Sequence, residues 1–303
     1  MNIFLDNVDI SSRSGPNSFG KKLKREFERC GHKVLMAVDE CGKTLPDIQL
    51  SFIMAKFKIA PIIQRLDGIY FNSDQDFNSL NSPIEATYQH ADAVIFQSEF
   101  NKDLTSHYFG VKERSFIIRN GTDLEKIDSV LPIENDNLDK FDNVWSCASS
   151  WRPHKRLKDN IRYFVENSGD NDCLVVAGKN PDHVVIHPRV LYAGELGWNT
   201  LISLYKRSKY FIHLAWLDHC PNVVIDARAS GCHIICSSAG GTREIAGENS
   251  TIIVEDDWNF TPVKLYNPPD MDFSNSVKGD SSHNIDIRKV SEMYLDVARE
   301  ILE

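Results

Sequence analysis

The sequence predicts an α/β protein built from two doubly wound domains, and three observations support this. Short apolar runs alternate with helical patterns along nearly the whole chain, which is typical of parallel strands joined by crossover helices. The chain has 303 residues, a length that favours about two domains. A polar, acidic, proline-containing segment at 124–142 separates two strand-rich blocks. We therefore expect an N-terminal domain over 1–135, a C-terminal domain over 136–284, and a last helix over 285–303 that packs back across both domains.

The expected elements follow from the spacing of apolar residues. Strands are predicted by short runs rich in Val, Ile, Leu and Phe, at 2–6, 33–38, 49–54, 60–64, 92–96, 115–119, 143–148, 173–178, 189–194, 210–215, 233–237 and 250–255. Helical patterns lie at 17–30, 83–91, 98–109, 156–166, 198–207, 221–230 and 285–302. The region 256–284 is rich in Asn, Asp, Pro and Ser and is expected to be a loop.

Composition narrows the class of protein. A net charge of −9 argues against a general nucleic-acid binder, because such proteins replace counterions with excess positive charge. The seven cysteines form no CxxC pair, so we expect buried, reduced thiols. No run approaches the roughly 20 apolar residues of a membrane span, and the N-terminus leads straight into a strand-like run. These observations predict a cytoplasmic globular protein.

The stretch WLDHCPNVVIDARASG at 216–231 is the first candidate site. Pro221 suits the first position of a helix, and Asn222 and Asp226 then share one face of it. The free N–H groups of residues 222–224 would favour a phosphate, and Asp218 and Asp226 would accept hydrogen bonds from hydroxyls such as those of ribose or a sugar. The alternative is that Asp218 caps the helix and Asp226 is a solvated surface acid.

A glycine turn is the second candidate. SSAGGTREIAG at 237–247 follows an expected strand, so Gly240 and Gly241 allow bare backbone amides to approach an anion. The alternative is a tight turn without a ligand, in which Glu244 holds the turn in place.

A basic loop, SSWRPHKRLKDN at 149–160, is the third candidate and also follows an expected strand. Arg152, Lys155, Arg156 and Lys158 crowd the start of a helix, where the helix dipole disfavours cations. An anionic ligand would resolve this conflict. The alternative is a solvated basic turn. Taken together, the three loops describe a nucleotide-diphosphate site in the second half of the chain.

These segments resemble a known family. DHCPNVVIDARASG followed by HIICSSAGGTREIAG looks like the signature of retaining glycosyltransferases of family 4, which have the GT-B fold of two Rossmann-like domains facing across a cleft. The family's two acids are eight residues apart, as Asp218 and Asp226 are here. WRPHKRL, the segment at 96–127 and the glycine-containing segment at 14–34 are also similar to the family, so the resemblance spans most of the chain.

The resemblance implies a function and a set of roles. Arg152 and Lys155 would neutralise the leaving diphosphate, Asp218 would bind the donor sugar, and Asp226 would bind the ribose. The activity implied is hexosyl transfer from a UDP- or GDP-linked sugar to a glycan, lipid-linked or other hydroxyl acceptor, with retention and with neither a metal nor another cofactor. The donor-binding residues would be Gly15, Asn222, Val223, Asp226, Gly240, Gly241 and Thr242, with backbone amides of Asn222, Val223 and Gly241 on the phosphate or the sugar.

The chain departs from the family pattern at three places. Both acidic positions carry Asp, which is one methylene shorter than the family's Glu. The N-terminal domain is shorter than usual for the family. Where the family commonly has a histidine after an N-domain strand, PIIQRLDGIY offers Arg65 and Asp67 as acceptor-side residues, although Asp67 before Gly68 is alternatively a turn residue.

Competing interpretations remain at the level of the sequence. The main one is an accessory protein that binds a nucleotide sugar but has lost turnover; an epimerase or phosphorylase on the same fold is another. Three D-x-D matches, at 74–76, 170–172 and 270–272, follow no convincing strand, and no G-x-G-x-x-G follows the first strand. The helix KKLKREFER at 21–29 is either solvated or a basic surface for peripheral membrane contact.

Overall fold

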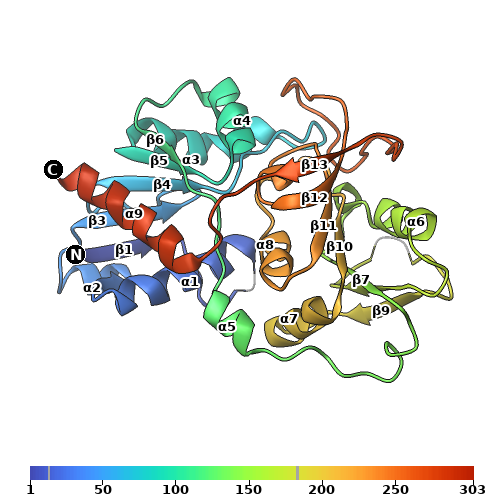
Figure 1. Ribbon diagram of the computed structural model, residues 1–303. Coiled ribbons are helices and arrows are strands. Elements are labelled where there is room, and N and C mark those ends of the chain that lie inside the picture. Colours follow the sequence, from blue (N-terminus) through green and yellow to red (C-terminus); the bar gives the residue numbers. More distant parts are fainter. Residues whose placement is uncertain (13, 182–183) are drawn as a thin grey trace. The chain divides into compact units, whose positions relative to one another are not determined.

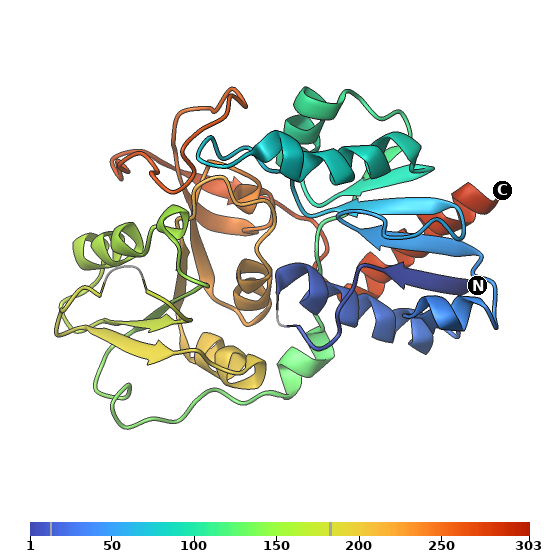
Figure 2. The same cartoon turned by 180° about the vertical axis from the view of Figure 1, so that it is seen from behind.

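The computed structural model describes residues 1–12, 14–181 and 184–303, and these form two compact units. Unit 1 comprises Met1–Asp123, Phe260–Val263 and Asn284–Glu303, and unit 2 comprises Leu124–Asn259 and Lys264–His283. Figure 1 and Figure 2 show the elements of each unit from opposite sides. The first unit ends at Asp123 rather than near 135, because the short helix α5 (Leu124–Ser129) belongs to unit 2. The last helix belongs to unit 1.

Unit 1 contains a six-stranded, all-parallel sheet in the order β2-β1-β3-β4-β5-β6. Helices cover both of its faces, which confirms the doubly wound architecture expected from the alternating pattern. The elements are β1 (Asn2–Asp6), α1 (Gly15–Arg29), β2 (Lys33–Leu35), α2 (Val38–Cys41), β3 (Ile48–Phe52), β4 (Ile62–Leu66), α3 (Phe77–His90), β5 (Ala93–Phe96), α4 (Glu99–Phe109), β6 (Ser115–Ile117) and α9 (Ile287–Leu302).

The C-terminal helix α9 lies beside α1 on one face of this sheet (Figure 1). The Phe19 and Tyr294 rings of the two helices are 6.0 Å apart. Asp286 caps α9, since its carboxylate accepts from the Arg288 N–H at 3.0 Å. On the opposite face α3 packs through Tyr88, whose ring lies 6.5 Å from that of Phe96. The buried face of α9 thus completes the core of unit 1.

Unit 2 contains a seven-stranded sheet in the order β13-β12-β11-β10-β7-β8-β9, in which all neighbours are parallel except the β12–β13 pair. Trp145 meets Phe164 of α6 on one face, and Phe211 meets Tyr205 of α7 on the other. The elements are β7 (Val144–Ala148), η1 (Pro153–Lys155), α6 (Leu157–Asn167), β8 (Cys173–Ala177), β9 (Val190–Gly194), α7 (Trp198–Arg207), β10 (Tyr210–His213), α8 (Asn222–Ala229), β11 (His233–Ser237), η2 (Thr242–Glu244), β12 (Glu248–Ile253) and β13 (Ser276–Asp280).

The twelve expected strands are all present, and the differences are local. β13 lies inside the expected loop 256–284, because its polar strand SVKGD carries no apolar alternation. α3 begins at Phe77 rather than at 83: Asp76 caps it by accepting from the Ser79 N–H at 3.1 Å, and Pro83 lies inside the helix. The end of the expected strand 33–38 is instead the start of α2.

Candidate functional site

The strand order of unit 2 changes direction at β7 and β10. From β7 the chain continues to β8 and β9 on one side of the sheet, and then returns to place β10, β11 and β12 on the other. The loops that follow β7 and β10 therefore leave the same edge of the sheet in opposite directions, and this is where parallel α/β sheets bind ligands. These loops are residues 149–156 and 214–221, and the glycine turn after β11 lies next along the same edge. All three predicted anion-binding loops thus come together at one switch point.

The glycine turn holds the backbone of Asp218. Asp218 and Gly240 form an isolated parallel bridge, and the Gly241 N–H donates to the Asp218 carbonyl at 2.7 Å. Gly240 has a φ of +97°, and a Cβ there would lie 2.6 Å from the Asp218 carbonyl oxygen. Only glycine therefore fits this turn without a shift of the backbone. In this conformation the Gly241 amide already donates to Asp218, so its contact with a donor phosphate or sugar stays a prediction.

The Asp218 side chain is held by three donors. The Lys155 ammonium lies 2.5 Å from Oδ2, the His213 Nε2 lies 3.0 Å from the same oxygen, and the His219 N–H donates to Oδ1 at 3.0 Å. Burial alone would raise the pKa of the Asp218 carboxyl, but the Lys155 ammonium and the His213 hydrogen bond lower that pKa well below its usual value. Asp218 is therefore ionised near neutral pH, with 15% of its side chain exposed. It accepts hydrogen bonds within the loop and is not simply a helix cap.

Three histidines surround this pair, and sequence reasoning did not single out any of them. Burial lowers the pKa of His154 to about 3 and that of His219 to about 4, with the Lys155 ammonium acting in the same direction on both. Burial also lowers the pKa of His213. All three imidazoles are therefore neutral at pH 7, so Lys155 carries the local positive charge. The signal in the sequence was the spacing HLAWLDH, which places histidines on either side of Asp218.

Asp226 is buried, with 5% exposure, and lies on α8. The indole N–H of Trp198 donates to Asp226 Oδ2 at 3.0 Å. The Lys126 ammonium lies 4.7 Å from the centre of the Trp198 ring. The alternative of a solvated surface acid is therefore wrong. One oxygen of the Asp226 carboxylate, which was expected to bind a ribose, already accepts a hydrogen bond from Trp198.

The first turn of α8 also differs in detail from the expectation. Pro221 is the residue before the helix rather than its first residue, with φ −69° and ψ 117°. The Val224 N–H donates to the Pro221 carbonyl at 3.1 Å, so this amide is not available to a phosphate. Asn222 and Val223 are partly exposed at the helix start, and their contact with a donor stays a prediction.

The basic loop separates into two parts with different partners. Arg152 is exposed, and its side chain makes no ion pair or hydrogen bond within the described residues. Arg156 is buried in a left-handed conformation with φ +52°, and its guanidinium binds both Glu255 carboxylate oxygens at 2.8 Å. Lys158 is exposed. The anion that neutralises Arg156 is therefore an internal carboxylate, whereas Arg152 stays open to a ligand.

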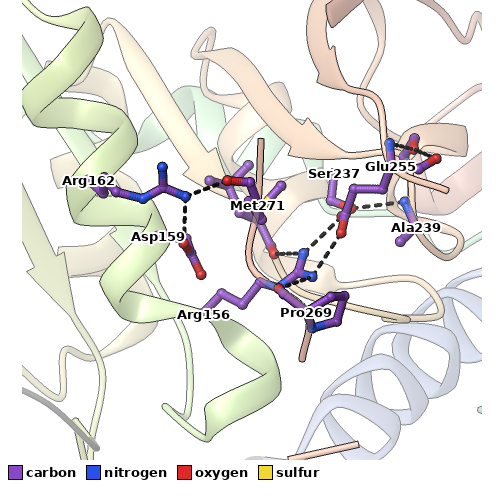
Figure 3. Close-up of polar contacts among 10 residues, drawn as sticks. Arg156, Asp159, Arg162, Ser237, Ala239, Glu255, Pro269 and Met271 are labelled. Atoms are coloured by element: carbon purple, nitrogen blue, oxygen red, sulfur yellow. Dashed lines mark hydrogen bonds and ion pairs between the residues drawn. The ribbon is translucent and has the colours of Figure 1, made fainter. Parts of the chain in front are cut away.

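Figure 3 shows how this internal pair ties segments of unit 2 together. Arg156 also donates to the Pro269 carbonyl at 3.0 Å, and Arg162 of α6 donates to the Met271 carbonyl at 2.7 Å. The Ser237 hydroxyl donates to Glu255 and accepts from the Ala239 N–H at 2.9 Å. The start of the glycine turn and the segment around 269–271 are thus both fixed to the basic loop.

The predicted acceptor-side residues lie in unit 1 and behave differently from each other. Arg65 is fully buried, and its guanidinium lies 4.4 Å from the ring centre of Phe19 and 4.9 Å from that of Phe52. The guanidinium donates hydrogen bonds to Asp67, Asn120 and Tyr294. The structure therefore gives Arg65 a structural contact, in which its side chain fixes α9 to the sheet, and its contact with an acceptor stays a prediction. Asp67 is 13% exposed, and its buried Oδ2 has no hydrogen-bond partner in the described part of the chain. Burial raises the pKa of Asp67.

The two remaining donor-binding candidates belong to different units. Gly15 is the exposed first residue of α1 in unit 1. Thr242 begins η2 in unit 2, is fully buried, and has a hydroxyl without a hydrogen-bond partner among the described residues. The structure thus places Thr242 beside the glycine turn but beneath the surface.

Three basic residues of helix α1 form ion pairs within unit 1. Lys24 pairs with Glu28 at 2.5 Å, Arg25 with Asp123 at 2.7 Å, and Arg29 with Glu26 at 2.6 Å. Such intramolecular pairs weaken the interpretation of residues 21–29 as a basic membrane-contact surface. Across the described ranges, no helix is both long and apolar enough to cross a bilayer. Within the same ranges, no group of three or more His, Cys, Asp or Glu side chains is arranged to hold a metal ion.

Comparisons with known proteins agree with this geometry. Residues 134–259 match the family model described as "Glycosyl transferases group 1", which covers less than half of the chain but all three switch-point loops. No curated protein sequence matches the chain. Solved structures do match, among them sucrose-phosphate synthase from Thermosynechococcus elongatus, at 12% identity and a TM-score of 0.69 over 99% of this chain and 97% of that one.

Two further structures were solved with ligands. Anabaena Alr3699/HepE in complex with UDP and glucose matches at 12% identity and a TM-score of 0.68, over 99% of this chain and 100% of that one. The catalytic domain of starch synthase IV from Arabidopsis thaliana, bound to ADP and acarbose, matches at 10% identity and a TM-score of 0.69, over 99% of each chain. At these identities the likeness shows the fold alone: the chain has the GT-B fold.

Proposed function

We propose that this protein is a retaining glycosyltransferase of the family 4 type, which transfers a hexose from a nucleoside-diphosphate sugar to a glycan, lipid-linked or other hydroxyl acceptor without a catalytic metal. The observation that carries the proposal is the convergence of Arg152, Lys155, Asp218 and the Gly240–Gly241 turn at the switch point of unit 2. All of these residues lie inside the segment that matches the glycosyltransferase family model. The resemblance to family 4 and the nucleotide-bound structural neighbours support the donor class.

The roles follow from charge and exposure. Arg152 is open to a ligand and presents a planar fork that suits a diphosphate. Lys155 is 18% exposed, and a diphosphate would compete with Asp218 for its ammonium. As the bond between sugar and diphosphate breaks, these two cations stabilise the negative charge that develops on the leaving group. Asp218, ionised and clamped by the glycine turn, accepts hydroxyls of the donor sugar, and Asn222 and Val223 contact the phosphate or sugar.

An accessory protein that binds a nucleotide sugar without turnover is the second candidate. The observation that favours it is Asp226, which is 5% exposed and bound to Trp198 instead of being open to a ribose. The shorter Asp at this position limits how far the carboxylate reaches toward the helix start. In this candidate the donor site persists and catalysis is lost.

The test is calorimetric titration with UDP, GDP, ADP and their glucose conjugates in excess chelator. We expect one diphosphate to bind selectively and to be weakened at least tenfold by either Arg152→Ala or Lys155→Ala, since each removes a charge-assisted contact worth about 1.5–3 kcal/mol. Lys158→Ala is the matched control, because Lys158 is an exposed lysine of the same loop. No binding of any nucleotide to the folded protein would contradict the donor site.

Turnover separates the two candidate functions. A protein that binds a diphosphate sugar is incubated with it at high concentration, and release of the diphosphate by transfer to water or to added glycans is followed over hours. Release that Lys155→Ala abolishes supports the transferase. Tight binding with no release under any condition supports the accessory protein.

A further inference from the structure

We propose that His213 is a positioning residue that holds the Asp218 carboxylate in place for the donor sugar after Lys155 turns to the diphosphate. The inference rests on the proposed function, and it adds a residue that neither the family resemblance nor the comparisons assign. It starts from the way in which Asp218 Oδ2 is shared between a lysine and a histidine.

His213 carries its proton on Nε2. Asp218 is ionised, so it only accepts hydrogen bonds, and the contact with His213 Nε2 at 3.0 Å requires a hydrogen on that nitrogen. His213 is 4% exposed, and burial keeps its imidazole neutral. The contact is therefore a hydrogen bond from a neutral donor to a carboxylate, and it adds no charge to the site.

The His213 side chain has less conformational freedom than that of Lys155. His213 ends β10 in register with Cys236 of β11, and its ring lies parallel to that of Phe211, 6.4 Å away. A side chain on a central strand has little freedom, whereas the Lys155 side chain comes from a 3₁₀ turn and has four rotatable carbons. Asp218 is thus bonded on one side to a fixed neutral donor and on the other to a mobile cation.

A bound diphosphate would change the partners of the Asp218 carboxylate. When Lys155 moves to the diphosphate, Asp218 loses its cationic partner and keeps only the His213 and His219 donors. Without His213, a carboxylate with 15% exposure would rotate or take up a proton, and it could no longer accept from the sugar hydroxyls. His213 therefore acts on sugar binding and not on diphosphate binding.

The ionisable groups around the pair come from three elements. Lys155 and His154 lie on the loop after β7, His219 follows Asp218 in its own loop, and Cys236 lies beside His213 on β11. Burial raises the pKa of the Cys236 thiol to about 12, so it stays neutral with the histidines. Lys155 and Asp218 are charged at pH 7, and Arg152 of the same loop adds a second positive charge near His154.

The first experiment compares two ligands on the same variants. His213→Leu removes the donor at similar volume, and we expect about tenfold weaker binding of the diphosphate sugar with diphosphate binding within about twofold of wild type. His213→Gln restores an N–H donor and recovers most of the loss. His233→Leu is the control, since His233 is also a strand histidine of this sheet, at the start of β11, and it hydrogen-bonds Thr251 at 2.9 Å. Equal weakening of both ligands, or of neither, would overturn the proposal.

The second experiment needs no ligand, so it separates this inference from the proposed function. The Asp218 carboxyl pKa is measured by NMR on protein with ¹³C-labelled aspartate, with Asp218→Asn used to assign the signal. We expect His213→Leu to raise this pKa by roughly one unit and His213→Gln to raise it less. An unchanged pKa in His213→Leu would refute the positioning role even if every nucleotide binds. A raised pKa of Asp218 in His213→Leu, together with no nucleotide binding to the wild type, would support the positioning role of His213 and contradict the proposed donor site.

Discussion

Each unit has an ion pair at the carboxyl edge of its parallel sheet, and the two pairs are built differently. In unit 1, Arg65 and Asp67 form a pair in which the arginine is fully buried between aromatic rings. In unit 2, Lys155 and Asp218 form a pair in which both side chains keep 15–18% exposure. The arginine of the first pair is fully enclosed, whereas the lysine of the second is partly exposed, so that water or a ligand can reach it.

We interpret the first pair as structural and the second as part of the proposed donor site. Arg65 uses its fork to bind Asn120 at 2.7 Å and Tyr294 at 3.1 Å, so it joins three elements of unit 1. Lys155 binds a single carboxylate and can exchange it for another anion. The sequence analysis treated all four residues as candidates for contact with a ligand: Arg65 and Asp67 on the acceptor side, and Lys155 and Asp218 on the donor side. The predictions below test whether the two pairs differ as this comparison requires.

The largest effect is expected for Arg65→Met. It leaves Asp67, Asn120 and Tyr294 without their buried partner, so we expect a loss of about 3–5 kcal/mol in the free energy of unfolding, measured with urea. Arg114→Met is the control, since its pair with Glu300 is exposed with an N···O distance of 3.9 Å and should change stability by less than about 0.5 kcal/mol. A loss below about 1 kcal/mol for Arg65→Met would remove the structural interpretation.

Acid should destabilise the protein through the neutral histidines of unit 2. His154 and His219 have pKa values of about 3 and about 4, below the usual value of 6.5, so the unfolded chain binds protons first as the pH falls below about 6.5. Each group should then cost about 2 kcal/mol of stability between pH 7 and pH 5. Urea titrations at both pH values measure this.

His154→Gln should remove its own share of that pH dependence, about 2 kcal/mol, because it replaces one imidazole of lowered pKa by a group that does not titrate. His90→Gln, at an exposed histidine of α3, is the matched control and should leave the pH dependence as it is. A free energy of unfolding that is the same at pH 7 and pH 5 would contradict the assignment of buried, neutral histidines around Asp218.

Gly240→Ala should cost about 2–3 kcal/mol, because it combines a positive φ with a contact of 2.6 Å on the Asp218 carbonyl. Gly31→Ala separates the two causes: Gly31 also has a positive φ, +81°, but nothing lies within 4 Å of its added Cβ. That variant should cost only about 1 kcal/mol. Equal losses in the two variants would show that the glycine turn does not clamp Asp218.

The sequence predicted most of this architecture because the strands are short apolar runs bounded by glycine or proline. It also predicted the three loops of the site, since each follows a strand. It did not predict which basic residue is internal: Arg152 and Arg156 are four residues apart, and only the fold shows that Glu255 lies beside Arg156. Nor did it reveal His213: the spacing HLAWLDH places this histidine near Asp218 in the sequence, but a histidine in the apolar run YFIHLA reads equally as a core residue until the fold shows its contact.

The smallest stability effect, and the one that defines the comparison, is expected for Lys155→Met. Asp218 keeps the His213 and His219 donors, and its remaining exposure allows water to solvate it, so we expect a loss of about 1 kcal/mol in the free energy of unfolding. The same variant should lose diphosphate binding, measured by calorimetry on protein shown to be folded. A variant that is as unstable as Arg65→Met would mean that both pairs are structural, and the case for a mobile cation at the donor site would end there.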